Sequence, residues 1–279
     1  MYVRNSTAPL HHVLVCPPTY LKTAAPINEI SKKYVNQPLD AAKLQAEFKS
    51  LLEIYQQTNV AVSELAPAPT MPNSIFSRDF GACVKEGYIL GNSREPIRFE
   101  ERAAYEHRMA ELGIPKICEV KKGHFEGGDF AFLNEHTIAI GMLARTDPTG
   151  FDIIKSALTA LNYQVFPVPA NPDYLHLDMC FNLVDDHLAV AYPQGLPKPF
   201  LELLDQLNIK IIPVPETAIF AHGCNLESLG NHRVISLKQN ISVNEALRQN
   251  GMTVFELDAT ETLKAGGGPH CMTFPLNRQ

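Results

Sequence analysis

One supersecondary pattern recurs four times along this 279-residue chain. Each copy has two apolar segments that flank a short polar turn, which is the pattern of a β-hairpin. A helical stretch and a further apolar strand follow each hairpin. The turns are about 45 to 51 residues apart, a spacing typical of repeated units. The predicted turns are 85–87, 134–136, 185–187 and 230–232, the helices 100–112, 149–161, 199–207 and 243–249, and the third strands 116–120, 164–168, 210–214 and 253–257.

The two ends of the chain supply a fifth, split unit. We predict strands at 12–16, 60–65 and 272–276, and a helix that begins after Asp40 and ends near Gln57. If the last strand pairs with the first, the units close into a ring. The prediction is therefore an α/β fold of five ββαβ units around a pseudo-fivefold axis, in a single domain over 1–279. An open α/β sheet is less favoured, because hairpins make antiparallel neighbours whereas doubly wound sheets need crossover connections.

Composition excludes several classes of protein. The net charge is −6, which argues against a nucleic-acid partner because such proteins carry a basic face. No apolar run is long enough to cross a membrane. The six cysteines are scattered without a CxxC pair, which favours a reduced, cytoplasmic protein and gives no spacing suited to a structural metal. We expect no metal and no other cofactor. The sequence leaves open whether the protein forms a homodimer.

Polar residues occupy equivalent points of the repeats, where an inner strand should be apolar. In a ring of repeats these points converge near the axis, where charges are costly unless they are paired or matched to a ligand. A cavity lined by carboxylates favours a cation. A guanidinium is a good match because it is planar, permanently charged and donates five hydrogen bonds. The residues concerned are Asp79, Glu126, Asp129, His176 and Asp178.

Taken singly, these residues have structural alternatives. Asp79 follows Arg78 and could form a surface ion pair with it. Glu126 precedes two glycines and could be a turn residue, and His176 could be a core histidine with satisfied hydrogen bonds. Their joint occurrence at equivalent points of the repeats is what favours a functional site.

Cys271 is the counterpart of these residues at the C-terminal end of the chain. It follows Gly266–Gly268 and Pro269, so a loop with backbone freedom leads directly to it. Loops of this kind commonly carry reactive side chains on a rigid scaffold. The alternative is an inert cysteine that begins a strand, since free cysteines are usually buried.

Five motifs in order resemble the guanidino-group-modifying superfamily, which includes dimethylarginine dimethylaminohydrolase, arginine deiminase and the amidinotransferases. The resemblance runs over nearly the whole chain and implies a five-bladed α/β propeller, the pentein fold. The motifs are Phe76-Ser77-Arg78-Asp79, Phe125-Glu126-Gly127-Gly128-Asp129, Gly141 with Arg145-Thr146, His176-Leu177-Asp178 and the glycine-led Cys271.

The resemblance implies a division of roles among the polar residues. Cys271 would be the nucleophile, His176 the general acid and base, and Glu126 the carboxylate that orients the guanidinium. A thiolate suits this reaction because it is the best side-chain nucleophile near neutral pH. Asp79 and Asp178 would complete the grip on the substrate cation.

The remaining substrate contacts are also implied by the resemblance. Arg145, with Arg98 as a less certain helper, would hold the α-carboxylate of the substrate. Asn28 lies in the segment 19–40, which we expect to be a long loop that serves as a lid, and would contact the α-amino group. Asn73 stands where the family commonly has an aspartate, so one carboxylate of the usual pocket is missing.

The sequence thus predicts a cysteine-dependent hydrolase of a small cationic guanidino substrate. Arginine or an Nω-methylated arginine would yield citrulline and an amine or ammonia through a covalent amidino-cysteine intermediate. The short chain is similar to the dimethylarginine hydrolases, whereas His176-Leu177-Asp178 is closer to arginine deiminase and the amidinotransferases. Asp79 differs from the asparagine of two-step arginine dihydrolases, which disfavours ornithine as product. An amidinotransferase and an inactive guanidine-binding protein stay open as alternatives.

Overall fold

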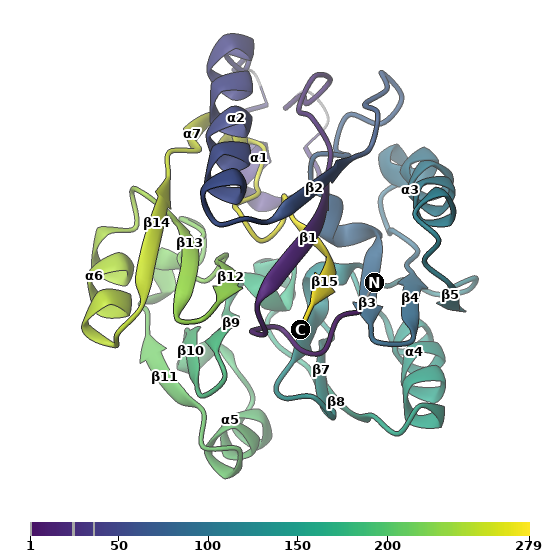
Figure 1. Cartoon of the computed structure of the whole chain (residues 1–279), viewed down its shortest axis with the longest axis vertical. Coiled ribbons are helices and arrows are strands. Elements are labelled where there is room, and N and C mark those ends of the chain that lie inside the picture. Colours follow the sequence, from purple (N-terminus) through teal and green to yellow (C-terminus); the bar gives the residue numbers. More distant parts are fainter. Residues whose placement is uncertain (1, 24–25, 36) are drawn as a thin grey trace.

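Five separate three-stranded sheets make up the computed structural model, which describes residues 2–23, 26–35 and 37–279 (Figure 1). In each sheet the middle strand pairs antiparallel with one neighbour and parallel with the other. The antiparallel pairs are the four predicted hairpins and the pairing of the first strand with the last. The sheets are β15–β1–β2 (Phe274–Arg278, Leu10–Val15, Ala61–Glu64), β3–β4–β5 (Gly81–Val84, Gly87–Leu90, Lys116–Glu119), β6–β7–β8 (Phe130–Phe132, Thr137–Gly141, Gln164–Val168), β9–β10–β11 (Phe181–Asp185, Leu188–Ala191, Lys210–Pro213) and β12–β13–β14 (Glu227–Gly230, Arg233–Leu237, Thr253–Leu257).

The five sheets contact one another in cyclic order around a common centre. Strand β15 contacts β3, β6 contacts β9, β9 contacts β12, and β12 contacts β1. The remaining contact joins the turn before β3 to the turn before β6. Figure 1 shows the sheets arranged around this centre with the helices outside them. This arrangement is the predicted five-bladed α/β propeller and differs from the alternative of one open sheet.

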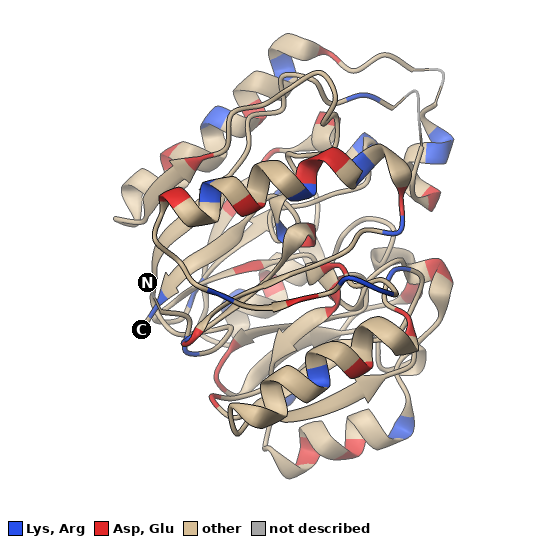
Figure 2. Cartoon of the chain, turned by 90° about the vertical axis from the view of Figure 1, so that its right-hand side faces the viewer, with Lys and Arg blue, Asp and Glu red and all other residues tan. Residues whose placement is uncertain are grey.

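The helices cover the outer edges of the sheets, and acidic and basic residues are interspersed along them (Figure 2). Helix α2 begins where the side chain of Asp40 accepts a hydrogen bond from Lys43 N. Its buried face includes Leu44, Phe48 and Leu51, at the spacing that predicted the helix. No helix in the described ranges has both the length and the apolar character to cross a membrane. The helices are α1 (Glu29–Lys33), α2 (Ala41–Gln57), α3 (Phe99–Glu111), α4 (Pro148–Ala160), α5 (Lys198–Gln206), α6 (Ile241–Gln249) and α7 (Thr260–Lys264).

Three details of the prediction were wrong. The segment 19–40 is not entirely loop, because Asn28 and Ser31 form a capping box that begins the short helix α1; residues 24, 25 and 36 of this segment lie outside the described residues. The last strand begins at Phe274 rather than at 272, so Cys271 lies in the preceding turn. The polar motifs also lie outside the inner strands, in short 3₁₀ turns directly before them.

Candidate active site

Three 3₁₀ turns bring the polar motifs together. Each turn precedes an inner strand, and contacts join Ser77–Phe80 to Gly127–Asp129 and Gly127–Asp129 to Leu177–Met179. Because the repeats place these turns at the same end of adjacent sheets, side chains far apart in the sequence meet. Glu126 and His176 are the N-cap residues of two of the turns.

Seven of the nine predicted site residues line one cavity. Asp178 and Asn73 are buried near it but do not line it. The apolar part of the lining includes Phe76 and Leu175. The seven residues are Asn28, Asp79, Arg98, Glu126, Arg145, His176 and Cys271.

The imidazole of His176 lies between two carboxylates. Its Nε2 is 2.9 Å from Oε2 of Glu126, and its Nδ1 is 3.9 Å from Oδ1 of Asp79. Burial works against a charged imidazole, but the carboxylates outweigh it and raise the pKa of His176 to about 9. His176 is therefore an imidazolium at neutral pH.

Glu126 is held as a carboxylate by several donors. Besides the bond to His176, its Oε1 accepts hydrogen bonds from Ser93 Oγ, from Arg94 N at 3.1 Å and from Arg145 Nη1 at 3.2 Å. Burial opposes ionisation, but the hydrogen bond from His176 and the charge of Arg145 hold the pKa of Glu126 well below its usual range. This fixes both the charge and the orientation of the His176–Glu126 pair.

The thiol of Cys271 lies in a different electrostatic environment. Asn225 Nδ2 donates to Cys271 Sγ at 3.0 Å, and Sγ is 3.7 Å from Oδ2 of Asp178. Burial raises the pKa of Cys271 well above its ordinary value, and the charges of Asp178 and Asp79 raise it further. In the absence of a cation, Cys271 is therefore a neutral thiol.

The carboxylate of Asp178 contacts the thiol of Cys271. One of its oxygens is hydrogen-bonded, and the other has no hydrogen-bond partner among the described residues. Its Oδ2 accepts hydrogen bonds from His270 Nδ1 at 2.8 Å and from Asn225 Nδ2 at 3.1 Å. Its Oδ1 is buried and has no hydrogen-bond partner among the described residues. Burial opposes ionisation, but the bond from His270 lowers the pKa of Asp178, so this side chain is a carboxylate.

Both arginines of the cavity are paired with carboxylates. Arg98 forms ion pairs with Asp79 and Glu101 and donates to the carbonyl oxygen of Phe76. Arg145 pairs with Glu126 at 3.2 Å, as described above, and with Glu95 at 3.5 Å. The second carboxylate oxygen of Asp79 is buried and has no hydrogen-bond partner in the described ranges.

The two predicted asparagines occupy different positions. Asn28 caps α1, and its Nδ2 donates to the carbonyl oxygen of Ala265 at 3.0 Å, which ties this segment to the glycine loop. Gly266 has a φ of +92° and a Cβ there would lie within 2.5 Å of the Asn28 side chain. Asn73 is buried and does not line the cavity, and its Nδ2 has no partner among the described residues.

Three of these groups are also close enough together for a metal ion. Ligand atoms of Asp79, Glu126 and His176 lie within 4.8 Å of one another. However, Glu126 is bonded to His176 and Arg145, and Asp79 is paired with Arg98. These contacts account for the cluster, so we assign no metal centre to it.

Sequence reasoning did not single out Asn225, which contacts the nucleophile candidate more closely than any predicted residue. Its Oδ1 also accepts from the backbone N of His270 at 3.1 Å and of Cys271 at 3.3 Å. Asn225 precedes β12 as Asp178 precedes β9. Asn225 stands two residues before its strand and Asp178 three, however, so aligning the fourth repeat with the third does not by itself equate them.

A propeller of five such sheets, with a cysteine, a histidine–glutamate pair and aspartates around one cavity, defines the guanidino-group-modifying superfamily with the pentein fold. Within it, residues 18–278 match the family described as N,N dimethylarginine dimethylhydrolase, eukaryotic. The chain belongs to this family.

Relatives of known sequence and structure agree with this assignment. The chain is 30% identical over 275 residues to the uncharacterized protein YkgA of Bacillus subtilis (strain 168), covering 99% of this chain and 94% of YkgA. It is 28% identical over 256 residues to an arginine deiminase of Bacillus thuringiensis subsp. konkukian, covering 75% of this chain but only 62% of the deiminase.

Two solved structures share the fold. The product-bound N-terminal domain of ArgZ, a cyanobacterial arginine dihydrolase, superposes with a TM-score of 0.85 at 22% identity, over 96% of this chain and 97% of that domain. A dimethylarginine dimethylaminohydrolase variant, solved as an adduct with S-methyl-L-thiocitrulline, has a TM-score of 0.81 at 21% identity, over 96% and 100% of the two chains. At these identities the likeness concerns the fold.

Proposed function

We propose that this protein hydrolyses arginine or an Nω-methylated arginine to citrulline, releasing ammonia or an amine. The observation that carries the proposal is one cavity that holds a cysteine thiol, an imidazolium fixed by a glutamate, and an aspartate oxygen without a partner. Family membership supports the reaction class, and the substrate is inferred from the chemistry of the lining.

The carboxylates are the proposed binding site for the guanidinium. Oδ1 of Asp79, which lines the cavity, and Oδ1 of Asp178, which lies outside the lining but contacts Cys271 through its other oxygen, are buried acceptors without a partner in the described residues. Leaving such groups unpaired is costly, and a planar cation with five donors satisfies them. Glu126 would orient the same group, and Asn28, in the segment that closes one side of the cavity, would contact the α-amino group.

Arg145 is the proposed contact for the α-carboxylate of the substrate. It is 3.5 Å from Glu95, whose side chain is 32% exposed, so a substrate carboxylate can replace this partner with little loss. Arg98 is a weaker candidate, because Asp79 and Glu101 already use its guanidinium. Asn73 has no proposed direct contact, since it lies outside the cavity lining.

The proposed reaction follows from the charge states of Cys271 and His176 in the protein without substrate. A bound guanidinium lowers the pKa of Cys271, so the thiol releases its proton to solvent, and the resulting thiolate forms a bond to the guanidinium carbon. His176 gives its proton to the departing nitrogen, and the carbon–nitrogen bond breaks with its electron pair on the amine. The neutral imidazole then takes a proton from water as the water oxygen attacks the same carbon. The carbon–sulfur bond breaks with its electron pair on sulfur, and the hydroxyl of the adduct gives its proton to the released amine or ammonia, which leaves citrulline and the thiolate.

A citrulline assay tests the proposal. Arginine, monomethylarginine, asymmetric dimethylarginine and agmatine are offered side by side to purified protein, with Cys271→Ser as the blank. Product from the methylated substrates only indicates a dimethylarginine hydrolase, and product from arginine indicates a deiminase. Absence of any ureido product contradicts the proposal for these substrates.

The same assay separates the two alternatives. An amidinotransferase would give a new guanidine when a primary amine acceptor is added, and that amine would suppress citrulline. An inactive guanidine-binding protein would bind arginine but give neither product nor a covalent adduct on Cys271.

A further inference from the structure

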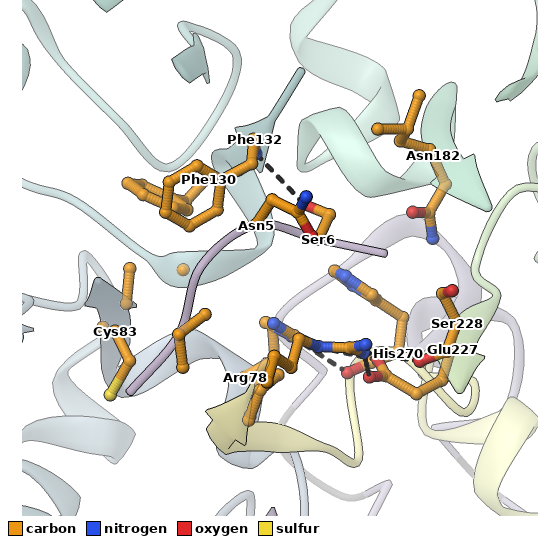
Figure 3. Close-up of a pocket in the computed structure, with 17 residues that line it drawn as sticks. Asn5, Ser6, Arg78, Cys83, Phe130, Phe132, Asn182, Glu227, Ser228 and His270 are labelled. Atoms are coloured by element: carbon orange, nitrogen blue, oxygen red, sulfur yellow. Dashed lines mark hydrogen bonds and ion pairs between the residues drawn. The ribbon is translucent and has the colours of Figure 1, made fainter. Parts of the chain in front are cut away.

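A second cavity, the axial cavity, lies at the common centre of the five sheets. Its lining includes residues from all five inner strands, β3, β6, β9, β12 and β15, and from the N-terminal segment. Figure 3 shows Asn5 and Ser6 on one side of this cavity and Arg78 and Glu227 on the opposite side. Adjacent residues of the chain separate it from the candidate substrate cavity, because Arg78 lines the axial cavity and Asp79 lines the other.

The lining of the axial cavity contains two arginines but only one carboxylate among the described residues. Glu227 forms ion pairs with Nη2 of Arg78 at 2.7 Å and with Nη2 of Arg278 at 2.5 Å. Burial lowers the pKa of Arg278, Glu227 opposes this, and the charge of Arg78 adds to it. One carboxylate therefore serves two guanidinium groups, and at least one positive charge of the lining is left unbalanced.

The carboxylates of the candidate active site have partners of their own. Asp79 forms an ion pair with Arg98, and Glu126 forms ion pairs with Arg145 and His176. Asp178 accepts a hydrogen bond from His270 and contacts neither arginine of the axial cavity. A further negative charge for Arg78 and Arg278 is therefore expected within the axial cavity itself.

Two hydrogen-bond donors of the lining are unused. Arg78 donates through Nε to the carbonyl oxygen of His270 at 3.3 Å and through Nη2 to Glu227, and its Nη1 has no partner among the described residues. Oδ1 of Asn5 accepts from the backbone N of Thr7 at 3.0 Å and of Ala8 at 2.6 Å, which fixes the amide. Its Nδ2 donates to no described residue. Donors without an acceptor beside an unbalanced positive charge favour an anion.

The size of the cavity limits which anion it can hold. Its volume is about 30 Å³, which is room for roughly one or two particles of the size of water. A phosphorylated metabolite or a dicarboxylate is much larger. A monatomic anion fits this space and needs no particular arrangement of the donors around it.

We propose that the axial cavity binds a chloride ion between Arg78 and Asn5, with the charge of Arg278 contributing to its stability. The backbone N of Arg78 also donates to the carbonyl oxygen of Cys271 at 3.1 Å. The ion therefore fixes a side chain whose backbone supports the turn that carries Cys271. No covalent bond forms or breaks, and the site does not depend on the proposed reaction.

Thermal unfolding of the whole protein tests the proposal, with sodium chloride replacing sodium gluconate at constant ionic strength. Gluconate carries the same charge but is too large for the cavity. A ligand that binds only the folded state raises Tm by mass action. Chloride should therefore raise Tm in a saturable manner, by roughly 2–4 °C at ten times its Kd. A Tm that is the same in both salts overturns the proposal.

Asn5→Asp supplies the missing negative charge from the protein itself. It keeps an acceptor for the backbone N of Thr7 and Ala8 and replaces the free amide nitrogen by a carboxylate oxygen. Its Tm in gluconate should approach that of the native protein in chloride, and added chloride should not raise it further. Arg78→Gln removes the cation and should also abolish the chloride response. This second variant keeps the test decisive if Asn5→Asp does not fold.

Asn134→Asp is the matched control. Oδ1 of Asn134 accepts from the backbone N of His136 and Thr137, both at 2.8 Å, which is the hydrogen-bond pattern of Asn5, but Asn134 does not line the axial cavity. This variant should keep the native chloride response. If Asn134→Asp also loses the response, net charge rather than the cavity causes it, and the proposal is wrong. A response that persists in both Asn5→Asp and Arg78→Gln overturns it as well.

Bromide locates the ion directly, because it has the charge of chloride and scatters X-rays anomalously. Crystals of the native protein grown with sodium bromide should show a buried anomalous peak between the side chains of Arg78 and Asn5. Crystals of Asn5→Asp should lack this peak. Anomalous peaks at the protein surface alone, with none in the axial cavity, would overturn the proposal.

Discussion

Oε2 of Glu126 lies 2.9 Å from Nε2 of His176. This one contact joins the second repeat to the third and, together with the charge of Asp79, favours the protonated form of the only imidazole that lines the candidate substrate cavity in the described residues. Because Glu126 is an ionised carboxylate, it stabilises the imidazolium. The pair is therefore suited to donating a proton to a departing amine.

The pH–rate profile should show the His176–Glu126 pair directly. The pKa of His176 is raised to about 9, so the acid is present below this pH and is lost as pH rises through it. Because this pKa is that of the free protein, we expect kcat/KM to fall on the alkaline side near pH 9. Glu126→Gln removes one of the charges that raise this pKa, beside that of Asp79, and should move this decline to lower pH. His176→Asn should lower kcat by about 10²- to 10⁴-fold at neutral pH. An alkaline limb that is the same in Glu126→Gln and the native protein would contradict the assignment.

Two adjacent glycines should respond differently to the same substitution. A Cβ at Gly128 would lie 2.7 Å from Nδ1 of His176, whereas a Cβ at Gly127 would lie within 2.2 Å of the backbone oxygens of Gly81 and Arg78. Gly128→Ala should therefore displace the imidazole and lower kcat while the fold persists. Gly127→Ala should lower the free energy of unfolding, since backbone atoms must move. Measurements of kcat and of urea unfolding for both variants check this prediction. A Gly128→Ala variant with the native kcat would contradict it.

Arg98 should matter for stability, whatever its part in substrate binding. Arg98→Ala leaves the buried carboxylates of Asp79 and Glu101 without their cation, and removing one partner of a buried ion pair costs about 3–5 kcal/mol. The matched control is Arg102→Ala, which breaks a partly exposed pair with Glu119 and should cost about 1 kcal/mol or less. Urea unfolding measures both. If both variants lose the same small amount of unfolding free energy and only Arg98→Ala has a raised KM, direct contact between Arg98 and the substrate would be favoured instead.

Ionisation of Cys271 should depend on a bound cation. Burial and the carboxylates of Asp178 and Asp79 raise its thiol pKa in the free protein, and a guanidinium in the cavity opposes this. Free guanidinium at a non-denaturing concentration should increase the ultraviolet absorbance of the thiolate, measured as the difference between the native protein and Cys271→Ser. An absorbance difference that guanidinium does not change would contradict the dependence of Cys271 ionisation on a bound cation.

The repeated hairpins made most of the fold predictable. Turn chemistry and strand spacing predicted four antiparallel pairs, and Leu14 does face Phe274 in the closing pair of β1 and β15. The boundaries near the site were less predictable. The sequence of Ser77–Phe80 predicts part of an apolar strand, but these residues form a 3₁₀ turn. In this turn the polar side chain of Asp79 lines the cavity instead of occupying a position in a sheet. Helix α1 depends on a two-residue capping box rather than on periodicity.

The sequence predicted which residues form the site but not which of them pair with one another. Equivalent positions in the repeats indicated which residues converge, and seven of the predicted site residues line one cavity. The sequence did not indicate that Arg98 would pair with Asp79 or that Asp178 would bond to His270. Such contacts depend on distances of a few ångström between blades, and repeat spacing does not specify these distances.

The central claim is that Cys271 attacks the guanidinium carbon, and the mass of the acid-quenched protein during turnover tests it most directly. Arginine and asymmetric dimethylarginine, where each is a substrate, should give the same adduct, because the departing nitrogen carries the methyl groups away. We expect Cys271 to gain the mass of the substrate minus its departing amine, and Cys271→Ser to gain none. Citrulline formation with an unmodified Cys271 throughout turnover, or by the Cys271→Ser variant, would contradict this account.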